Sequence, residues 1–154
     1  MSRRKCYLFD IDGTIADLTH RLPYIQKTPK IGVFWIYWDA FFGACGSDAP
    51  IQHIIDLLIT LHDADHQIIL VSGRSDQSKT ETLEWLTRHG LPDVPLYMRR
   101  QGDHRPDYQV KAELLDRIIA DGWRPVMAFD DRDQVVKMWR ERGVPCAQVA
   151  DGNF

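Results

Sequence analysis

Short apolar runs alternate with helical patterns along most of this 154-residue chain, and this alternation constrains the fold more than any other feature. Between the runs, apolar residues recur at the spacing of one helix face, as at Ile51, Ile54, Ile55 and Leu58. Runs that are apolar at nearly every residue are typical of strands covered on both faces. We therefore predict five strands, at residues 6–9, 67–71, 96–98, 126–129 and 147–149.

Three glycines mark the ends of helical patterns. Gly90, Gly122 and Gly143 each follow such a pattern, at the position where a residue with left-handed backbone often ends a helix. Strands that alternate with helices imply right-handed crossovers and a mostly parallel sheet. The sequence therefore predicts an α/β fold, and its length is that of a single domain over residues 1–154.

Residues 16–50 interrupt this alternation, and they include the aromatic stretch VFWIYWDAFF at 33–42. A connection of this length inside a compact α/β domain is usually functional. Two interpretations remain open: a small cap that forms part of a substrate pocket, or an additional core helix whose aromatic side chains pack. The two are compatible, with some rings buried and others facing a ligand.

The charge and the cysteines limit the class of protein. A net charge of −3 gives no overall attraction to nucleic acid, although a local basic site remains possible. The three cysteines are widely spaced and form no metal-binding or disulfide pattern, which suits a reducing compartment. The chain contains no apolar run long enough for a signal peptide or a membrane span. We expect a cytoplasmic protein.

Polar side chains gather where the predicted strands end. Ligands of parallel sheets bind beyond the carboxyl ends of the strands. Lys111 begins the helix before the fourth strand and is expected at the same crevice. The other groups follow the first, second and fourth strands: Asp10 and Asp12, then Ser72, Gly73 and Arg74, then Asp130, Asp131 and Arg132.

Four converging carboxylates would raise one another's pKa unless a cation were present. Hard oxygen ligands in a loose cluster suit Mg²⁺. Ser72 and Lys111 would then hold an anion, and the combination describes a phosphoryl-transfer site. In this interpretation Asp10 attacks phosphorus, while Asp12 protonates the leaving oxygen and later activates water.

Each signal also has a structural explanation. Asp-x-Asp-Gly can be a turn, Asp-Asp-Arg can cap a helix, and a single lysine on a helix is usually solvated. The order of the signals and their common position at strand ends favour a site over these explanations.

The strings FDIDGT, VSGR and FDDR, together with Lys111, resemble in this order the motifs of the haloacid dehalogenase (HAD) phosphohydrolase superfamily. The resemblance implies a Rossmann-like fold with strand order 3-2-1-4-5, helices on both faces and a cap inserted after the first motif. It also implies a magnesium ion held by Asp10, the backbone carbonyl of Asp12, and the Asp130/Asp131 pair.

The second half of the chain, with LYMRRQGDHRPDYQVKAELL and FDDRDQVVKMWRERGVPCAQVADGNF, is similar to the phosphatase domain of the bacteriophage polynucleotide kinase/phosphatase family. That family removes 3′-phosphates from nucleic acid ends. The likeness implies functional roles for Arg21, Arg74, Asp107 and Lys111. The chain contains no P-loop, so we expect no kinase half, and a separate polynucleotide kinase or ligase is an expected partner.

The sequence leaves the substrate open between two phosphorylated ligands. For a polynucleotide 3′-phosphatase, a basic rim would bind the phosphate backbone and aromatic side chains would stack a terminal base. Alternatively, these arginines pair with Asp103, Asp107 and Glu113 on the surface. The rim would contain Arg21, Arg74, Arg99, Arg100, His104 and Arg105, and the aromatic side chains would be Trp35, Tyr37 and Trp38.

The second candidate is a nucleotidase for free deoxynucleoside monophosphates, with residues 16–50 closing over one nucleotide. A third is a non-catalytic module that binds phosphate with Mg²⁺. The presence of both Asp10 and Asp12 argues against it, since binding alone does not require the second carboxylate.

Overall fold

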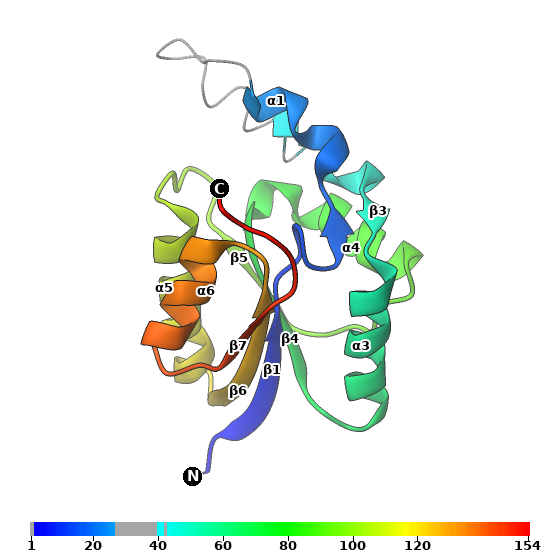
Figure 1. Ribbon diagram of the computed structural model, residues 1–154. Coiled ribbons are helices and arrows are strands. Elements are labelled where there is room, and N and C mark those ends of the chain that lie inside the picture. The colour runs from blue at the N-terminus through cyan, green and yellow to red at the C-terminus, as the bar shows by residue number, and fades with distance from the viewer. Residues whose placement is uncertain (1, 27–39, 42) are drawn as a thin grey trace.

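The computed structural model describes residues 2–26, 40–41 and 43–154, and its centre is a five-stranded parallel sheet (Figure 1). In chain order the strands of this sheet are β1 (Arg4–Phe9), β4 (Ile68–Ser75), β5 (Leu96–Arg99), β6 (Trp123–Asp130) and β7 (Cys146–Gln148). Their spatial order is β5-β4-β1-β6-β7. Counted along the chain within this sheet, that is 3-2-1-4-5, the order that the HAD resemblance implied.

Helices cover both faces of the sheet, as the apolar strands predicted. One face packs a core that includes Leu8, Ile69 and Leu115, and the other packs a core that includes Phe9, Leu70 and Trp85. In Figure 1, α5 (Asp107–Ala120) and α6 (Asp133–Glu141) lie on one side, while α3 (Gln52–Asp63) and α4 (Lys79–Arg88) lie on the other. The chain is therefore a three-layered α/β fold.

The glycines expected at helix ends have the predicted backbone. Gly90, Gly122 and Gly143 have φ values of 75°, 94° and 79°, in the left-handed region. Each lies within two residues of the C-terminal end of α4, α5 or α6. Because a side chain is strained at such φ values, these positions favour glycine and define where each helix stops.

Several predicted boundaries were wrong: the fourth strand begins at Trp123 rather than at residue 126, and two further differences affect the site. The second strand does not end at residue 71 but continues through Ser75, with a register irregularity between Ser72 and Ser75. Helix α5 begins at Asp107, one turn before Lys111. Both Asp107 and Lys111 therefore project from the first turns of the same helix, at spacing i,i+4.

The two ends of the 16–50 stretch lie side by side. Ala16–Asp17 (β2) and Ala49–Pro50 (β3) pair as a two-stranded antiparallel sheet. The described part between them contains two 3₁₀ turns and the short helix α1 (Pro23–Gln26). Trp35, Tyr37 and Trp38 lie outside the described residues, so the role of the aromatic stretch stays a prediction.

No helix in the described part of the chain has the length and apolar character that crossing a membrane would require.

Candidate active site

The strand register places two carboxylates next to each other. Phe9 of β1 pairs with Phe129 of β6, so the residues that follow, Asp10 and Asp130, lie side by side at the carboxyl end of the sheet. The Nζ atom of Lys111 lies 2.7 Å from Asp10 Oδ1 and 2.9 Å from Asp130 Oδ2, and donates to both. The Thr14 hydroxyl donates to Asp10 Oδ2 at 3.0 Å. Both oxygens of Asp10 are thus held in a fixed orientation.

Asp130 is held as firmly as Asp10. Its Oδ1 accepts from the backbone N–H of Asp131 at 2.9 Å, and its Oδ2 accepts from the indole N–H of Trp139 at 3.1 Å. Asp10, Asp130 and Asp131 are all buried, and each offers an oxygen within 4.8 Å of the others. The structure therefore brings together the carboxylates of the three residues predicted to hold a metal by their side chains; the fourth predicted residue, Asp12, was expected to act through its backbone carbonyl.

The charges in this cluster do not balance. Burial and the neighbouring Asp130 raise the pKa of Asp10 well above its ordinary value, although Lys111 lowers it. Burial and Asp130 also raise the pKa of Asp131. Among the described residues, the cation that contacts the cluster is Lys111, with one charge against three carboxylates. Hard oxygen ligands with excess negative charge fit a divalent cation such as Mg²⁺.

Two glycines allow the loops of the site to approach closely. A Cβ atom on Gly13, whose φ is +80°, would lie 2.1 Å from Asp131 Oδ2. A Cβ atom on Gly73 would lie 1.9 Å from Asp107 Oδ1. Any side chain at these positions would displace a carboxylate of the site, which explains why glycine follows Asp12 and Ser72.

A second buried cluster surrounds Asp12. Asp12 Oδ1 accepts from Arg21 at 2.5 Å and from the NH2 group of Arg74 at 2.7 Å. Asp48 accepts from the same two arginines, with Oδ2 at 2.9 Å from an NH2 group of each. Two carboxylates and two guanidinium groups thus form a network of balanced charge.

The two carboxylates of this network titrate differently. Burial raises the pKa of Asp12, but Arg74 and Arg21 outweigh it and lower the pKa to about 2. Burial raises the pKa of Asp48 above its ordinary value despite the same arginines. Burial lowers the pKa of Arg74, but Asp12 raises it above its ordinary value. Asp12 is therefore an ionised carboxylate at neutral pH in this arrangement.

The structure corrects the predicted environment of Arg21 and Arg74. Both residues have 0% exposed surface, so the expectation that they form part of an accessible basic rim is wrong. Their contacts with Asp12 instead suit a role in orienting that carboxylate. Ser72, predicted to hold an anion, is also fully buried, and its hydroxyl accepts from the backbone N–H of Arg74 at 3.1 Å.

Three residues of the site escaped the sequence analysis. Asp48 lies in the segment assigned to a cap, and no local motif surrounds it. Trp139 follows an ordinary apolar helix pattern, and only the contact of its indole N–H with Asp130 distinguishes it from a packing residue. Thr14 was visible as the threonine of FDIDGT, four residues after Asp10, and that spacing could have identified it.

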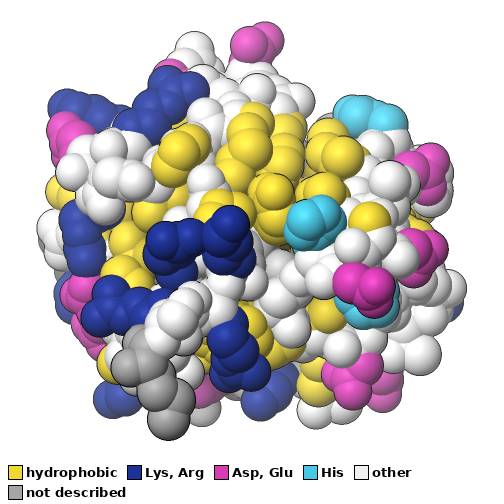
Figure 2. All heavy atoms as spheres, turned by 90° about the horizontal axis from the view of Figure 1, so that it is seen from below, with side chains coloured by type: hydrophobic (Ala, Val, Ile, Leu, Met, Phe, Trp, Pro, Cys, Tyr) yellow, Lys and Arg dark blue, Asp and Glu magenta, His cyan; other side chains and the backbone are white. Residues whose placement is uncertain are grey.

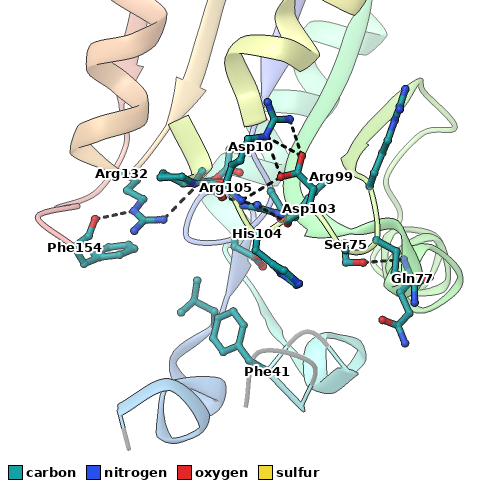
Figure 3. A pocket seen from close by; sticks show the side chains of 18 of the residues that line it. Asp10, Phe41, Ser75, Gln77, Arg99, Asp103, His104, Arg105, Arg132 and Phe154 are labelled. Atoms are coloured by element: carbon teal, nitrogen blue, oxygen red, sulfur yellow. Dashed lines mark hydrogen bonds and ion pairs between the residues drawn. The ribbon is translucent and has the colours of Figure 1, made fainter. Parts of the chain in front are cut away.

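A pocket of about 730 Å³ opens beside the two clusters. Asp10 and Asp12 line it, and so do Arg132 and Phe154. Figure 3 shows side chains from separate elements converging on this space, with Phe41 and His104 projecting into it. Other predicted site residues that line the pocket are Gly73, Arg99, Arg105, Asp107 and Asp131.

The arginines at the pocket wall are largely paired within the protein. Arg99 donates to the carbonyl oxygens of Gly73, Asp103 and Arg105, and its NH2 group lies 3.5 Å from Asp107 Oδ1. Arg105 forms ion pairs with Asp103 and Glu113. These are the surface pairs that the sequence left open as an alternative. Arg100 is exposed, lines the pocket and forms no ion pair with another described residue.

Basic side chains also gather on the opposite face of the molecule, where Figure 2 shows lysine and arginine beside a larger apolar area. Arg3, Arg4 and Lys5 are exposed at the beginning of β1, and Arg124 is exposed on β6. Positive surface is therefore not confined to the pocket. The charge of a basic side chain does not by itself indicate substrate binding, whereas its position at the pocket does.

The fold and the site have the features expected of a phosphatase of the HAD type, the class that the family match below establishes. A parallel sheet covered on both faces carries an acidic cluster at the ends of β1 and β6. A haloacid dehalogenase-like family hydrolase from Streptococcus pneumoniae has the same fold, with a TM-score of 0.68 over 94% of this chain and 84% of that one, at 12% identity.

The chain belongs to the family of polynucleotide kinase phosphatase domains, because the model of that family matches residues 39–154. A putative bifunctional polynucleotide kinase/RNA ligase of Autographa californica nuclear polyhedrosis virus is 28% identical over 92% of the chain. A solved Pnkp1/Rnl/Hen1 RNA repair complex contains a chain that is 29% identical, with a TM-score of 0.83 over 99% of this chain. This chain spans only 18% and 44% of those two proteins.

Proposed function

We propose that this phosphatase is a Mg²⁺-dependent polynucleotide 3′-phosphatase that acts through an aspartyl-phosphate on Asp10. The observation that carries the proposal is the fixed Asp10 carboxylate, held by Lys111 and Thr14 in a pocket that Arg100 and Arg132 also line. The family to which the chain belongs supports a phosphorylated nucleic acid end as the substrate.

In the first step, a carboxylate oxygen of Asp10 attacks phosphorus and the bond from phosphorus to the 3′ oxygen breaks. The negative charge of the bound phosphate raises the pKa of Asp12, so Asp12 takes up a proton as the substrate binds and then passes it to the leaving oxygen. Asp12 Oδ1 accepts three hydrogen bonds from Arg21 and Arg74, whereas Oδ2 accepts one, at 3.2 Å from Arg74 Nε. Oδ2 is therefore the oxygen with capacity to carry that proton.

In the second step, Asp12 accepts a proton from a water molecule as that water attacks the phosphorus of the aspartyl-phosphate. The bond from phosphorus to Asp10 then breaks, which restores the carboxylate and releases inorganic phosphate. Lys111 remains between Asp10 and Asp130 and offsets negative charge throughout. Arg21 and Arg74 hold the Asp12 side chain, which acts first as acid and then as base, in place without a metal ion.

Magnesium would be held by Asp10, Asp130 and Asp131, with the backbone carbonyl of Asp12 completing the set that the HAD resemblance implies. Bound there, it would polarise the phosphoryl oxygens and neutralise charge in the transition state. The all-oxygen donor set and the unbalanced negative charge support this ion over a softer metal.

We infer that residues 16–50 act as a cap over the pocket. The antiparallel pair of Ala16–Asp17 and Ala49–Pro50 ties the two ends of this stretch together beside the catalytic loop, and Leu18, Leu22 and Phe41 from it line the pocket. A separate polynucleotide kinase or ligase is the partner that we propose, since the viral relative is named as a kinase and ligase and the similar solved chain belongs to an RNA repair complex.

The decisive experiment measures phosphate release with Mg²⁺ from 3′- and 5′-phosphorylated oligonucleotides and mononucleotides. We expect the highest kcat/KM on a 3′-phosphorylated oligonucleotide. Equal rates on a 3′-mononucleotide, or a preference for 5′-mononucleotides, would establish the nucleotidase instead. Absence of release from every substrate would contradict phosphatase activity on nucleotides altogether.

The contribution of the pocket wall can be separated from that of overall charge. Arg100→Ala removes an exposed cation at the pocket, and Arg124→Ala removes one on β6 at the opposite end of the sheet. We expect Arg100→Ala to lower kcat/KM on the oligonucleotide but not on the mononucleotide, because only the longer substrate carries further backbone phosphates. Equal losses in both variants would mean that the pocket does not select the longer substrate.

A further inference from the structure

We propose that the ring of Phe154, positioned by Arg132, is the surface on which the nucleobase of the terminal nucleotide stacks. The inference rests on the proposed function and identifies which part of the substrate the outer pocket recognises. It concerns a wall of the pocket that has no part in the chemistry at Asp10 and Asp12.

Phe154 is unusually exposed for a large apolar side chain. It has 57% exposed surface and lines the same pocket as Asp10 and Asp12. Single exposed apolar side chains are common, so the exposure of this ring becomes informative only through its position at the pocket, where a ligand can reach it. Figure 3 shows the ring at the edge of the pocket, next to Arg132.

The backbone that carries this ring is held against the site. A Cβ atom on Gly152 would lie 1.9 Å from the carbonyl oxygen of Asp131, so the segment presses directly against the loop that carries the acidic cluster. The carbonyl oxygen of Gly152 accepts from the backbone N–H of Asp133 at 2.8 Å. Arg132 Nε donates to the backbone oxygen of Phe154 at 2.7 Å. None of these contacts involves the ring itself.

Arg132 connects the ring to the reaction centre. Its guanidinium carbon lies 5.3 Å from the centre of the Phe154 ring, and its NH1 group lies 3.9 Å from Asp107 Oδ2. The same oxygen of Asp107 lies 3.8 Å from Lys111 Nζ, which contacts Asp10. A series of side-chain contacts thus runs from the ring through Arg132, Asp107 and Lys111 to the nucleophile.

These features fit a nucleobase better than a sugar or a second phosphate. Aromatic side chains bind bases by stacking, and every base has a π-face, so such a surface tolerates any sequence. A guanidinium group beside the ring adds a cation–π contribution. A phosphate would instead require donors at the ring position, and the Phe154 side chain has none.

The test compares two 3′-phosphorylated oligonucleotides that differ only in whether the terminal residue carries a base or a stable abasic analogue. Kcat/KM is measured on both for the wild-type chain and for Phe154→Ala, Phe154→Leu and Phe154→Trp. Because the backbone contacts of Gly152 and Phe154 remain in all of these variants, each changes the ring alone. Leu83→Ala, at an exposed apolar residue of α4 outside the pocket, is the control.

We expect Phe154→Ala to lower kcat/KM on the base-bearing substrate by about 5- to 150-fold, the range for loss of one stacked base. On the abasic substrate it should match the wild type. Phe154→Trp should retain activity, Phe154→Leu should resemble Phe154→Ala, and Leu83→Ala should change neither substrate.

Equal losses of Phe154→Ala on both substrates, or full activity of Phe154→Leu on the base-bearing one, would overturn the stacking proposal while leaving the 3′-phosphatase intact. If the wild-type chain released no phosphate from either oligonucleotide, the proposed function would be wrong and this inference with it.

Discussion

Asp10 and Asp12 are two residues apart, yet they belong to buried clusters of opposite character. Asp10 lies with Asp130 and Asp131 around a single lysine, and the negative charge is in excess. Asp12 lies with Asp48 between two arginines, and the charges balance. The first cluster has more carboxylates than internal partners, whereas the second supplies its own partners.

This difference indicates how one loop can carry two kinds of acid. A carboxylate in an unbalanced cluster is less stable as an anion. Binding of a cation, or formation of a bond from its oxygen to the substrate, therefore relieves the repulsion. A carboxylate between guanidinium groups is stabilised as an anion and held in place. The unbalanced cluster therefore suits the nucleophile and the metal, and the balanced one suits the group that must be oriented.

The comparison is tested most severely by Asp10→Asn. We expect kcat to fall by more than about 10³-fold, because the amide cannot attack phosphorus. In the presence of a chelator, the free energy of unfolding should not fall, since the substitution removes one of three repelling charges. Activity is measured by phosphate release and stability by urea denaturation. Residual activity above about one part in 10³ would mean that another group is the nucleophile.

The balanced cluster should respond in the opposite way. Asp48→Asn leaves the buried Arg21 and Arg74 with one fewer carboxylate, and we expect a loss of about 3–5 kcal/mol in the free energy of unfolding, as for other broken buried ion pairs. Asp103→Asn, which breaks a surface pair with Arg105, should cost far less. Similar losses in the free energy of unfolding for Asp48→Asn and Asp103→Asn would mean that the buried ion pairs contribute no more to stability than a surface pair.

Mg²⁺ should stabilise the folded chain by binding at the unbalanced cluster of Asp10, Asp130 and Asp131. At a concentration of 100 times its Kd, Mg²⁺ is expected to raise the stability of the wild-type chain by about 2.7 kcal/mol. Asp130→Asn should lose most of this gain, and Asp103→Asn should keep it. The measurement is the Tm with Mg²⁺ and with a chelator. A full gain in Asp130→Asn would place the ion elsewhere.

Much of the fold and part of the site followed from the sequence, for reasons that particular residues illustrate. The apolar strands and the glycines after α4, α5 and α6 were visible because they depend on local pattern and backbone conformation. The meeting of Asp10, Lys111 and Asp130 was visible because the carboxyl ends of parallel strands meet at one edge.

The environment of Asp12 could not be predicted in this way. Asp48 and Arg21 reach Asp12 through the irregular segment after β2, where no repeat determines which residues face each other. Burial also changed the interpretation of Arg21 and Arg74, since the sequence alone does not distinguish an arginine that binds substrate from one that orients a carboxylate. Side-chain contacts across irregular segments depend on tertiary packing, which the periodic signals do not contain.

The smallest expected effect concerns the pH dependence of the balanced cluster. The pKa of Asp12 is about 2 in the folded chain, below its ordinary value of 3.8, so its contribution to stability is complete above pH 3.8. That contribution is lost as pH falls through about 2, because the unfolded chain then binds the proton more readily.

Urea denaturation of the wild-type chain and of Asp12→Asn at pH 6 and pH 3 measures this contribution. The stability difference between the two should shrink by about 1 kcal/mol over that interval, since only the wild-type chain can be protonated at this position. For Asp10 we expect the opposite pH dependence. Because the pKa of Asp10 is raised in the folded chain, lowering the pH should increase the free energy of unfolding of the wild type relative to that of Asp10→Asn. Parallel pH profiles for the two variants would mean that the clusters do not differ in charge balance, and the contrast between them would fail.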